Sequence, residues 1–124
     1  MGAKVLSVDD ALFMRNMLRN IFSEGGFDVI GEGQNGNEAV EKYDQLQPDL
    51  VTMDIVMPEM NGFKATRYLS RHPDTLHIPV IIVSGVERDS DRFWGLKMGA
   101  RDFLAKPVNG PELLAKLSQV LAEA

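Results

Sequence analysis

The chain has 124 residues, a length that suits one domain with a single hydrophobic core. Its formal net charge of −5 argues against nucleic-acid binding, because proteins that bind nucleic acids usually carry a basic face. The absence of cysteine excludes disulfides and thiolate–zinc sites and fits a reducing compartment. No run approaches the ~20 apolar residues of a membrane span and no secretory signal is visible, so we expect a soluble cytoplasmic protein.

Strand-like and helix-like segments alternate five times along the chain. An apolar run at residues 5–8 precedes a helical pattern from Met14 to Phe22, which the pair Gly25-Gly26 ends. The later strands are expected at residues 27–31, 50–53, 80–83 and 101–105, and the later helices at residues 38–46, 63–71, 90–98 and 111–122. Alternating strands and helices with nearly continuous apolar strands predict an α/β fold, in which helices cover both faces of a parallel sheet. We expect one domain over residues 1–124.

Polar side chains follow the C-terminal ends of four of these strands. Asp9 and Asp10 follow the first strand, Asp54 the third, Ser84 the fourth and Lys106 the fifth. In an open parallel sheet those ends lie side by side, and ligands bind at that edge. Three carboxylates, a hydroxyl and an ammonium gathered there predict a site for magnesium and a phosphoryl group.

The expected crowding of carboxylates requires compensation by positive charge. Two carboxylates about 4 Å apart repel by ~4 kcal/mol at an effective dielectric constant of about 20. A Mg²⁺ ion, which prefers a few carboxylates with waters and phosphate oxygens, and the Lys106 ammonium could both supply that charge. A carboxylate held between the two could act as a nucleophile on phosphorus and form an aspartyl phosphate.

Each of these residues also has an ordinary structural interpretation. Asp10 could cap the helix that starts near Ala11, Ser84 could be a loop hydroxyl and Lys106 a surface lysine. Their joint occurrence at one edge of the sheet makes coincidence a poor explanation.

The combined motifs resemble the receiver domain of two-component response regulators, in particular a stand-alone, CheY-like receiver. The motifs are Asp9-Asp10, Asp54 with Met57-Pro58 and Asn61-Gly62, Ser84-Gly85 and Lys106-Pro107, and the resemblance covers the whole chain. It implies a (βα)5 doubly wound fold of the flavodoxin and CheY type, with strand order 2-1-3-4-5.

The resemblance also implies a role for each residue at the site. Asp54 would be the phosphoacceptor. Asp10, Asp54 and the backbone carbonyl of Val56 would bind Mg²⁺ directly, and Asp9 would act mostly through a metal-bound water. Lys106 would contact the phosphoryl group, and its bond to the following proline would be cis.

Four positions bear on switching and on the lifetime of the phosphoryl group. Ser84 would move toward the phosphoryl group together with Phe103, which stands where the family often has Tyr and which could equally be plain core. Val56 and Val86 flank the path of the hydrolytic water in such proteins, and neither valine can activate water. We therefore expect a long-lived phosphoryl group.

The sequence thus predicts a phosphorylation-gated binding switch rather than an enzyme. A histidine kinase would donate the phosphoryl group, and a target protein would bind the face made by helix 90–98, strand 101–105 and helix 111–122. Trp94 is by default a core residue but could anchor that target. The protein would act as a monomer, without nucleic acid or membrane, in a chemotaxis or pilus-motility pathway.

Several alternatives remain open or are disfavoured by particular residues. The chain could be a phosphorelay or phosphate-sink intermediate, or a fragment of a larger regulator or hybrid kinase. An aspartyl phosphatase would need a second acid at Val56, and a flavin carrier would need an uncharged phosphate cradle where Asp9 and Asp10 stand. His72 and His77 are expected to be surface residues away from the reactive edge.

Overall fold

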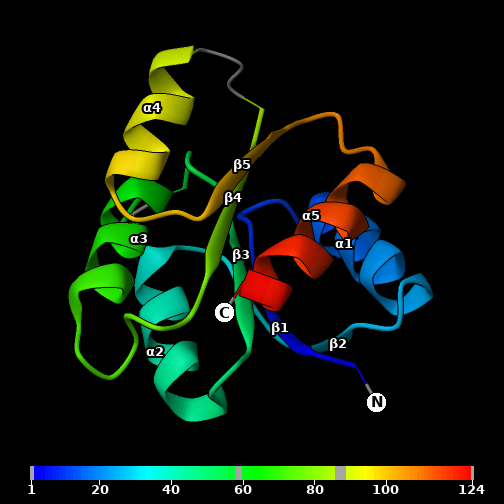
Figure 1. Ribbon diagram of the computed structural model, residues 1–124, viewed down its shortest axis with the longest axis horizontal. Helices are drawn as coiled ribbons and strands as arrows, with labels where there is room; N and C mark the ends of the chain where they lie inside the picture. The colour runs from blue at the N-terminus through cyan, green and yellow to red at the C-terminus, as the bar shows by residue number, and fades with distance from the viewer. Residues whose placement is uncertain (1, 58–59, 86–88, 124) are drawn as a thin grey trace.

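One five-stranded parallel sheet organises the protein, with its strands in the order β2-β1-β3-β4-β5 (Figure 1). The computed structural model describes residues 2–57, 60–85 and 89–123. The strands are β1 (Lys4–Val8), β2 (Asp28–Gly33), β3 (Leu50–Met53), β4 (Val80–Ser84) and β5 (Asp102–Ala105). The helices are α1 (Leu12–Glu24), α2 (Gly36–Leu46), α3 (Gly62–Arg71), α4 (Asp89–Lys97) and α5 (Gly110–Glu123). The predicted fold class and strand order are confirmed.

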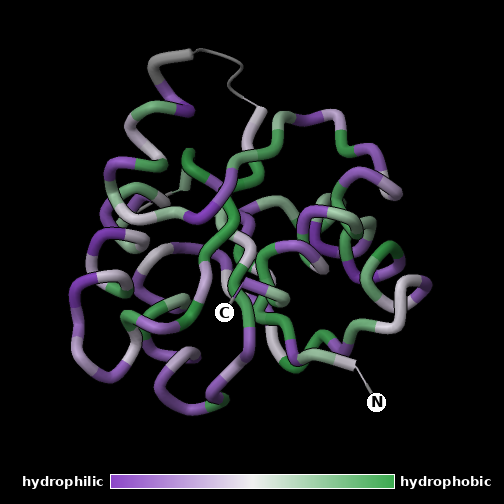
Figure 2. Tube along the Cα trace, in the orientation of Figure 1, coloured by the Kyte–Doolittle hydropathy of each residue, from purple (hydrophilic) through white to green (hydrophobic). Residues whose placement is uncertain are grey.

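Helices cover both faces of the sheet. Helices α1 and α5 lie on one face, and α2, α3 and α4 lie on the other (Figure 1). Successive strand residues point to opposite faces, so Ile81 packs with α1 and α5 whereas Val80 packs with α2 and α3. In Figure 2 the hydrophobic colour follows the central strands, and the hydrophilic colour gathers on the outer turns of the helices. Among helices in the described part of the chain, none combines the length and apolar character needed to cross a membrane.

The strand register brings the carboxyl ends of four strands to one level. Val8 of β1 pairs with Met53 of β3, so the residues that follow them emerge side by side. On the other side of β3, Ser84 of β4 pairs with Ala105 of β5, and the next amide, that of Lys106, donates to the Ser84 carbonyl at 2.8 Å. This edge of the sheet is where the predicted reactive side chains converge.

Asparagine caps fix the starts of three helices. Asn35, Asn61 and Asn109 each accept, through the side-chain oxygen, a hydrogen bond from the backbone N–H three residues later. The Asn35 cap starts α2 at residue 36, two residues earlier than the sequence pattern predicted. Strand β2 also differs from its predicted bounds, because its pairing with β1 continues as far as Gly33.

Candidate functional site

Three carboxylates meet at the end of β1 and β3. Asp9, Asp10 and Asp54 each place a carboxylate oxygen within 4.8 Å of the others. Asp9 and Asp54 are buried, whereas Asp10 is exposed, so the cluster opens to solvent on one side. A set of oxygen ligands reachable from solvent fits a hard divalent cation.

The environment of Asp54 favours the protonated form of its carboxyl group. Burial, followed by the charge of Asp9, raises the pKa of Asp54 to about 6, although Lys106 opposes the shift. The Oδ1 atom of Asp54 accepts a hydrogen bond from the Ile55 N–H at 2.9 Å, which fixes the carboxylate at the end of β3. Positive charge brought to this side chain therefore stabilises its ionised form.

Lys106 supplies a fixed positive charge to the cluster. Its Nζ lies 2.8 Å from Asp9 Oδ2 and 3.5 Å from Asp54 Oδ1, so the ammonium sits between the two buried carboxylates. The Lys106–Pro107 peptide bond is cis, as the resemblance implied. The loop after β5 thus directs this lysine toward the ends of β1 and β3.

Ser84 and Phe103 lie under the edge of the sheet rather than on its surface. Ser84 is fully buried at the end of β4. Phe103 is 5% exposed and packs with Ile82, Ile55 and Ala100 in a small cluster between the sheet and α4. Beyond Ser84, a Cβ placed on Gly85 would meet, among the described residues, only the Lys106 side chain within 4 Å, at 3.9 Å, so this position leaves room for an incoming group.

The loop that follows Asp54 is held against the start of α3. The Gly62 N–H donates to the Ile55 carbonyl at 2.9 Å, and a Cβ at Gly62 would lie 1.8 Å from the Asp54 carbonyl oxygen. In this loop Val56, two residues after Asp54, is 63% exposed. The second valine expected beside the path of water, Val86, lies outside the described residues.

Arg15 is a site residue that the sequence patterns did not single out. It is 8% exposed, its Nη1 donates to the Asp9 carbonyl at 2.7 Å, and its Nε pairs with Glu32 of β2 at 3.0 Å. Glu32 also pairs with Arg19, so the arginine that holds the Asp9 backbone is itself held. The available signal was a cation at helical spacing from the buried Leu18 and Phe22.

Two interpretations from the sequence are wrong. The N-cap of α1 is Ala11, without a side-chain cap, and it is Asp9 rather than Asp10 whose Oδ1 accepts the Ala11 N–H at 2.9 Å. Trp94 is not a core residue, since it is 47% exposed and its ring lies 5.5 Å from Lys97 Nζ. The expectation for the histidines holds, because His72 and His77 precede β4 at the opposite edge of the sheet.

The chain matches the response regulator receiver domain over residues 5–118. It belongs to this family. It is 44% identical over 120 residues to the chemotaxis protein CheY of Thermotoga maritima, and the aligned region covers 97% of this chain and 98% of that protein. It is 42% identical, over the same shares of both chains, to the protein PilH of Pseudomonas aeruginosa.

Solved structures of receivers have the same fold. The response regulator domain of Thermotoga maritima CheB superposes with a TM-score of 0.88 at 36% identity, covering 98% of both chains. CheY in the CheX–CheY–BeF3–Mg²⁺ complex of Borrelia burgdorferi superposes with a TM-score of 0.89 at 32% identity, covering 95% of this chain and 88% of that one. The family and the CheY-like character predicted from the sequence are confirmed.

Proposed function

We propose that this receiver accepts a phosphoryl group on Asp54 from a histidine kinase and then changes which protein it binds. The observation that carries the proposal is the position of the Lys106 ammonium, 2.8 Å from Asp9 and 3.5 Å from Asp54, beside an acidic cluster that can hold a cation. This is the arrangement that phosphoryl transfer to a carboxylate requires, with positive charge available on more than one side.

In the proposed reaction the Asp54 carboxylate attacks the phosphorus of a phosphohistidine. An O–P bond forms, the P–N bond breaks, and the leaving imidazole nitrogen keeps the electron pair and takes up a proton. Lys106 then faces the transferred oxygens. Asp9, Asp10, Asp54 and the Val56 carbonyl would hold Mg²⁺, which when bound neutralises charge on the phosphoryl oxygens.

The phosphorylated chain would signal through its surface rather than through catalysis on a substrate. Ser84 and Phe103 join the reactive edge to the cluster beneath α4, so a shift of either side chain reaches that helix. We propose that the target protein binds the face made by α4, β5 and α5, with the exposed Trp94 as one anchor. In this proposal the protein acts as a monomer, and its one receiver domain is the switch.

The pathway is proposed from similarity to named relatives. The resemblance to CheY of Thermotoga maritima and to PilH of Pseudomonas aeruginosa supports a chemotaxis or pilus-motility system. A phosphorelay or phosphate-sink role is the second candidate. The exposed Val56 favours it, because an apolar side chain beside the acceptor cannot activate water and would prolong the life of the aspartyl phosphate.

Incubation with acetyl phosphate and Mg²⁺, followed by intact mass measurement, tests the proposal. We expect the gain of one phosphoryl group, abolished by Asp54→Asn and by removal of Mg²⁺. The gain should be retained in the control variant Asp49→Asn, because Asp49 immediately precedes β3 at the opposite edge of the sheet. A folded protein that binds Mg²⁺ without gaining mass, or an Asp54→Asn variant that still gains it, would refute the assignment.

A further inference from the structure

Helix α3 carries a row of cations without any acidic residue. Lys64, Arg67 and Arg71 follow one another at spacings of three and four residues, so they line one face of the helix. No Asp or Glu occurs between Met60 and Pro73 in a chain whose formal net charge is −5. Positive charge is therefore segregated onto this helix.

The cations of this row have no acidic partner among the residues that the structure describes. Within the described part of the chain, none of the ion pairs involves Lys64, Arg67 or Arg71. Like charges four residues apart destabilise a helix, as does a cation such as Lys64 in its first turn. An anionic partner would relieve both effects.

A hollow of about 490 Å³ lies along the same face of α3. Its walls are mostly apolar and come from Lys64, Arg67, Tyr68, Arg71, His72 and Pro73. Tyr68 is 47% exposed and its ring stacks on that of His72, with 5.5 Å between centroids. The hollow thus offers an aromatic wall and a cationic rim, which suits an apolar side chain flanked by negative groups.

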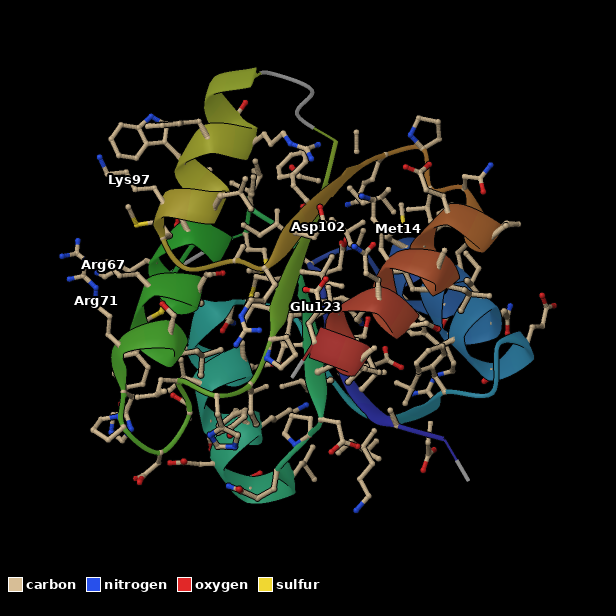
Figure 3. The ribbon with its side chains drawn as sticks, in the orientation of Figure 1. Met14, Arg67, Arg71, Lys97, Asp102 and Glu123 are labelled. Carbon is tan, nitrogen blue, oxygen red and sulfur yellow. The ribbon has the colours of Figure 1, made fainter. Side chains whose placement is uncertain are left out.

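Helix α4 extends this surface. Phe93 and Trp94 are both exposed, and the Nζ of Lys97 lies 5.6 Å and 5.5 Å from their rings. Lys97, Arg67 and Arg71 project from the same side of the molecule in Figure 3. The Ser70 hydroxyl donates to the Met98 carbonyl at 2.8 Å and joins the ends of the two helices. We call this surface the α3–α4 face; its residues are Lys64, Arg67, Tyr68, Arg71, Phe93, Trp94 and Lys97.

The opposite flank of α4 differs in its charge balance. There Arg92 lies 3.9 Å from Asp102 of β5, and Lys116 of α5 lies 3.2 Å from the same carboxylate. Arg92 and Lys116 are therefore paired inside the protein, whereas the cations of the α3–α4 face have no internal counter-ion among the described residues. This contrast indicates that the α3–α4 face is complementary to an acidic partner.

We propose that the α3–α4 face binds an acidic segment of a partner protein. Asp or Glu side chains of that segment pair with Arg67, Arg71 and Lys97, and one apolar side chain enters the hollow beside Tyr68. The negative overall charge of the chain disfavours long polyanions, which would meet repulsion beyond this face. The inference goes beyond the proposed phosphoacceptor function, because the residues of the α3–α4 face are not those of the acidic cluster at Asp54. Helix α4, with Trp94, borders both this face and the proposed target face.

Selection from a displayed library of random 12-residue peptides tests the proposal. The bait is the full chain carrying Asp54→Asn, so the outcome does not depend on phosphorylation. We expect enriched peptides to combine two or more acidic residues with one large apolar residue. Enrichment of neutral or basic peptides instead would overturn the proposal.

Charge removal then locates the binding site. In fluorescence-anisotropy titrations with the enriched peptide, Arg71→Gln should weaken binding about threefold and Arg67→Gln with Arg71→Gln about tenfold. Tyr68→Ala should also weaken binding, whereas the matched control Lys4→Gln, at the exposed start of β1, should leave the affinity unchanged. Circular dichroism spectra of the variants should match that of the parent chain if they fold.

Competition separates the other classes of anion. Duplex DNA and vesicles containing phosphatidylglycerol should displace the peptide only weakly. Equal loss of affinity in Lys4→Gln and Arg71→Gln would overturn the proposed location. Tighter binding of the DNA or the vesicles than of the peptide would overturn the proposed occupant.

Discussion

Replacing Asp54 with Asn should stabilise the metal-free protein at neutral pH. Burial and the neighbouring Asp9 raise the pKa of Asp54 from 3.8 to about 6. The folded protein therefore holds this proton more tightly than the unfolded chain, and stability is lost as pH rises between those two values. A shift of about two pKa units corresponds to ~3 kcal/mol above pH 6, which is an upper estimate of what the neutral amide recovers.

Urea unfolding in EDTA measures the effect. We expect Asp54→Asn to raise the free energy of unfolding by about 2–3 kcal/mol at pH 7.5 and by less than about 1 kcal/mol at pH 4, where the folded carboxyl is already protonated. The amide keeps an oxygen that can accept the Ile55 N–H. The exposed Asp10, whose charge contributes least to the shift, provides the matched control Asp10→Asn, which should gain less. A variant no more stable than the parent at pH 7.5, or an equal gain at both pH values, would refute the reasoning.

Four further predictions follow from the site. Calorimetric titration should show Mg²⁺ binding more tightly as pH rises from 5 to 7, because Asp54 must lose its proton to bind the ion. Gly62→Ala should lower the free energy of unfolding by about 1–3 kcal/mol, since its Cβ would strike the Asp54 carbonyl oxygen. Arg15→Gln should cost about 1–3 kcal/mol in the same assay by removing a donor to a buried carbonyl, and the more exposed Arg19→Gln should cost less. Val56→Asn should speed the loss of label from purified phosphoprotein several-fold, whereas an unchanged half-life would show that Val56 does not shield the aspartyl phosphate.

The convergence of the acidic residues was predictable because it depends on topology more than on detail. Once β1 and β3 are assigned as parallel strands, the residues that follow them must meet at one edge. Strand β3 was also predicted with its correct bounds, since a buried apolar run there lies between Pro48 and Asp54. The alternation of strands and helices, and the edge at which the acidic residues meet, therefore follow from the pattern of apolar runs, whereas the strand order was implied by the family resemblance.

The role of Arg15 depends on a longer chain of contacts. Its partner Glu32 lies on β2, and their meeting requires the register of β2 against β1, which includes an irregularity between Val5 and Leu6. The apolar pattern specifies which face of a strand is buried but leaves such a shift undetermined. The sequence shows a cation at helical spacing from Leu18 and Phe22, but neither its burial nor its acceptor.

The exposure of Trp94 departs from the default assignment to the core because the close contact of α4 with the sheet is made by a glycine. Gly95 is buried, and a Cβ there would lie 2.8 Å from the Ile82 side chain. With the inward position taken by a residue that has no side chain, the large apolar residues of α4 are displaced to the outside. A search for an apolar stripe therefore assigns Trp94 to the wrong side of the helix.

Asp102 makes two helices share one counter-ion. Its carboxylate faces Arg92 of α4 at 3.9 Å and Lys116 of α5 at 3.2 Å, and all three elements belong to the proposed target face. Any outward movement of α4 would release the longer of these contacts first and leave Lys116 with the carboxylate. The same movement would therefore leave the Arg92 guanidinium available to a partner. A change in the position of α4 would then also make the electrostatic potential of the target face more positive near Arg92.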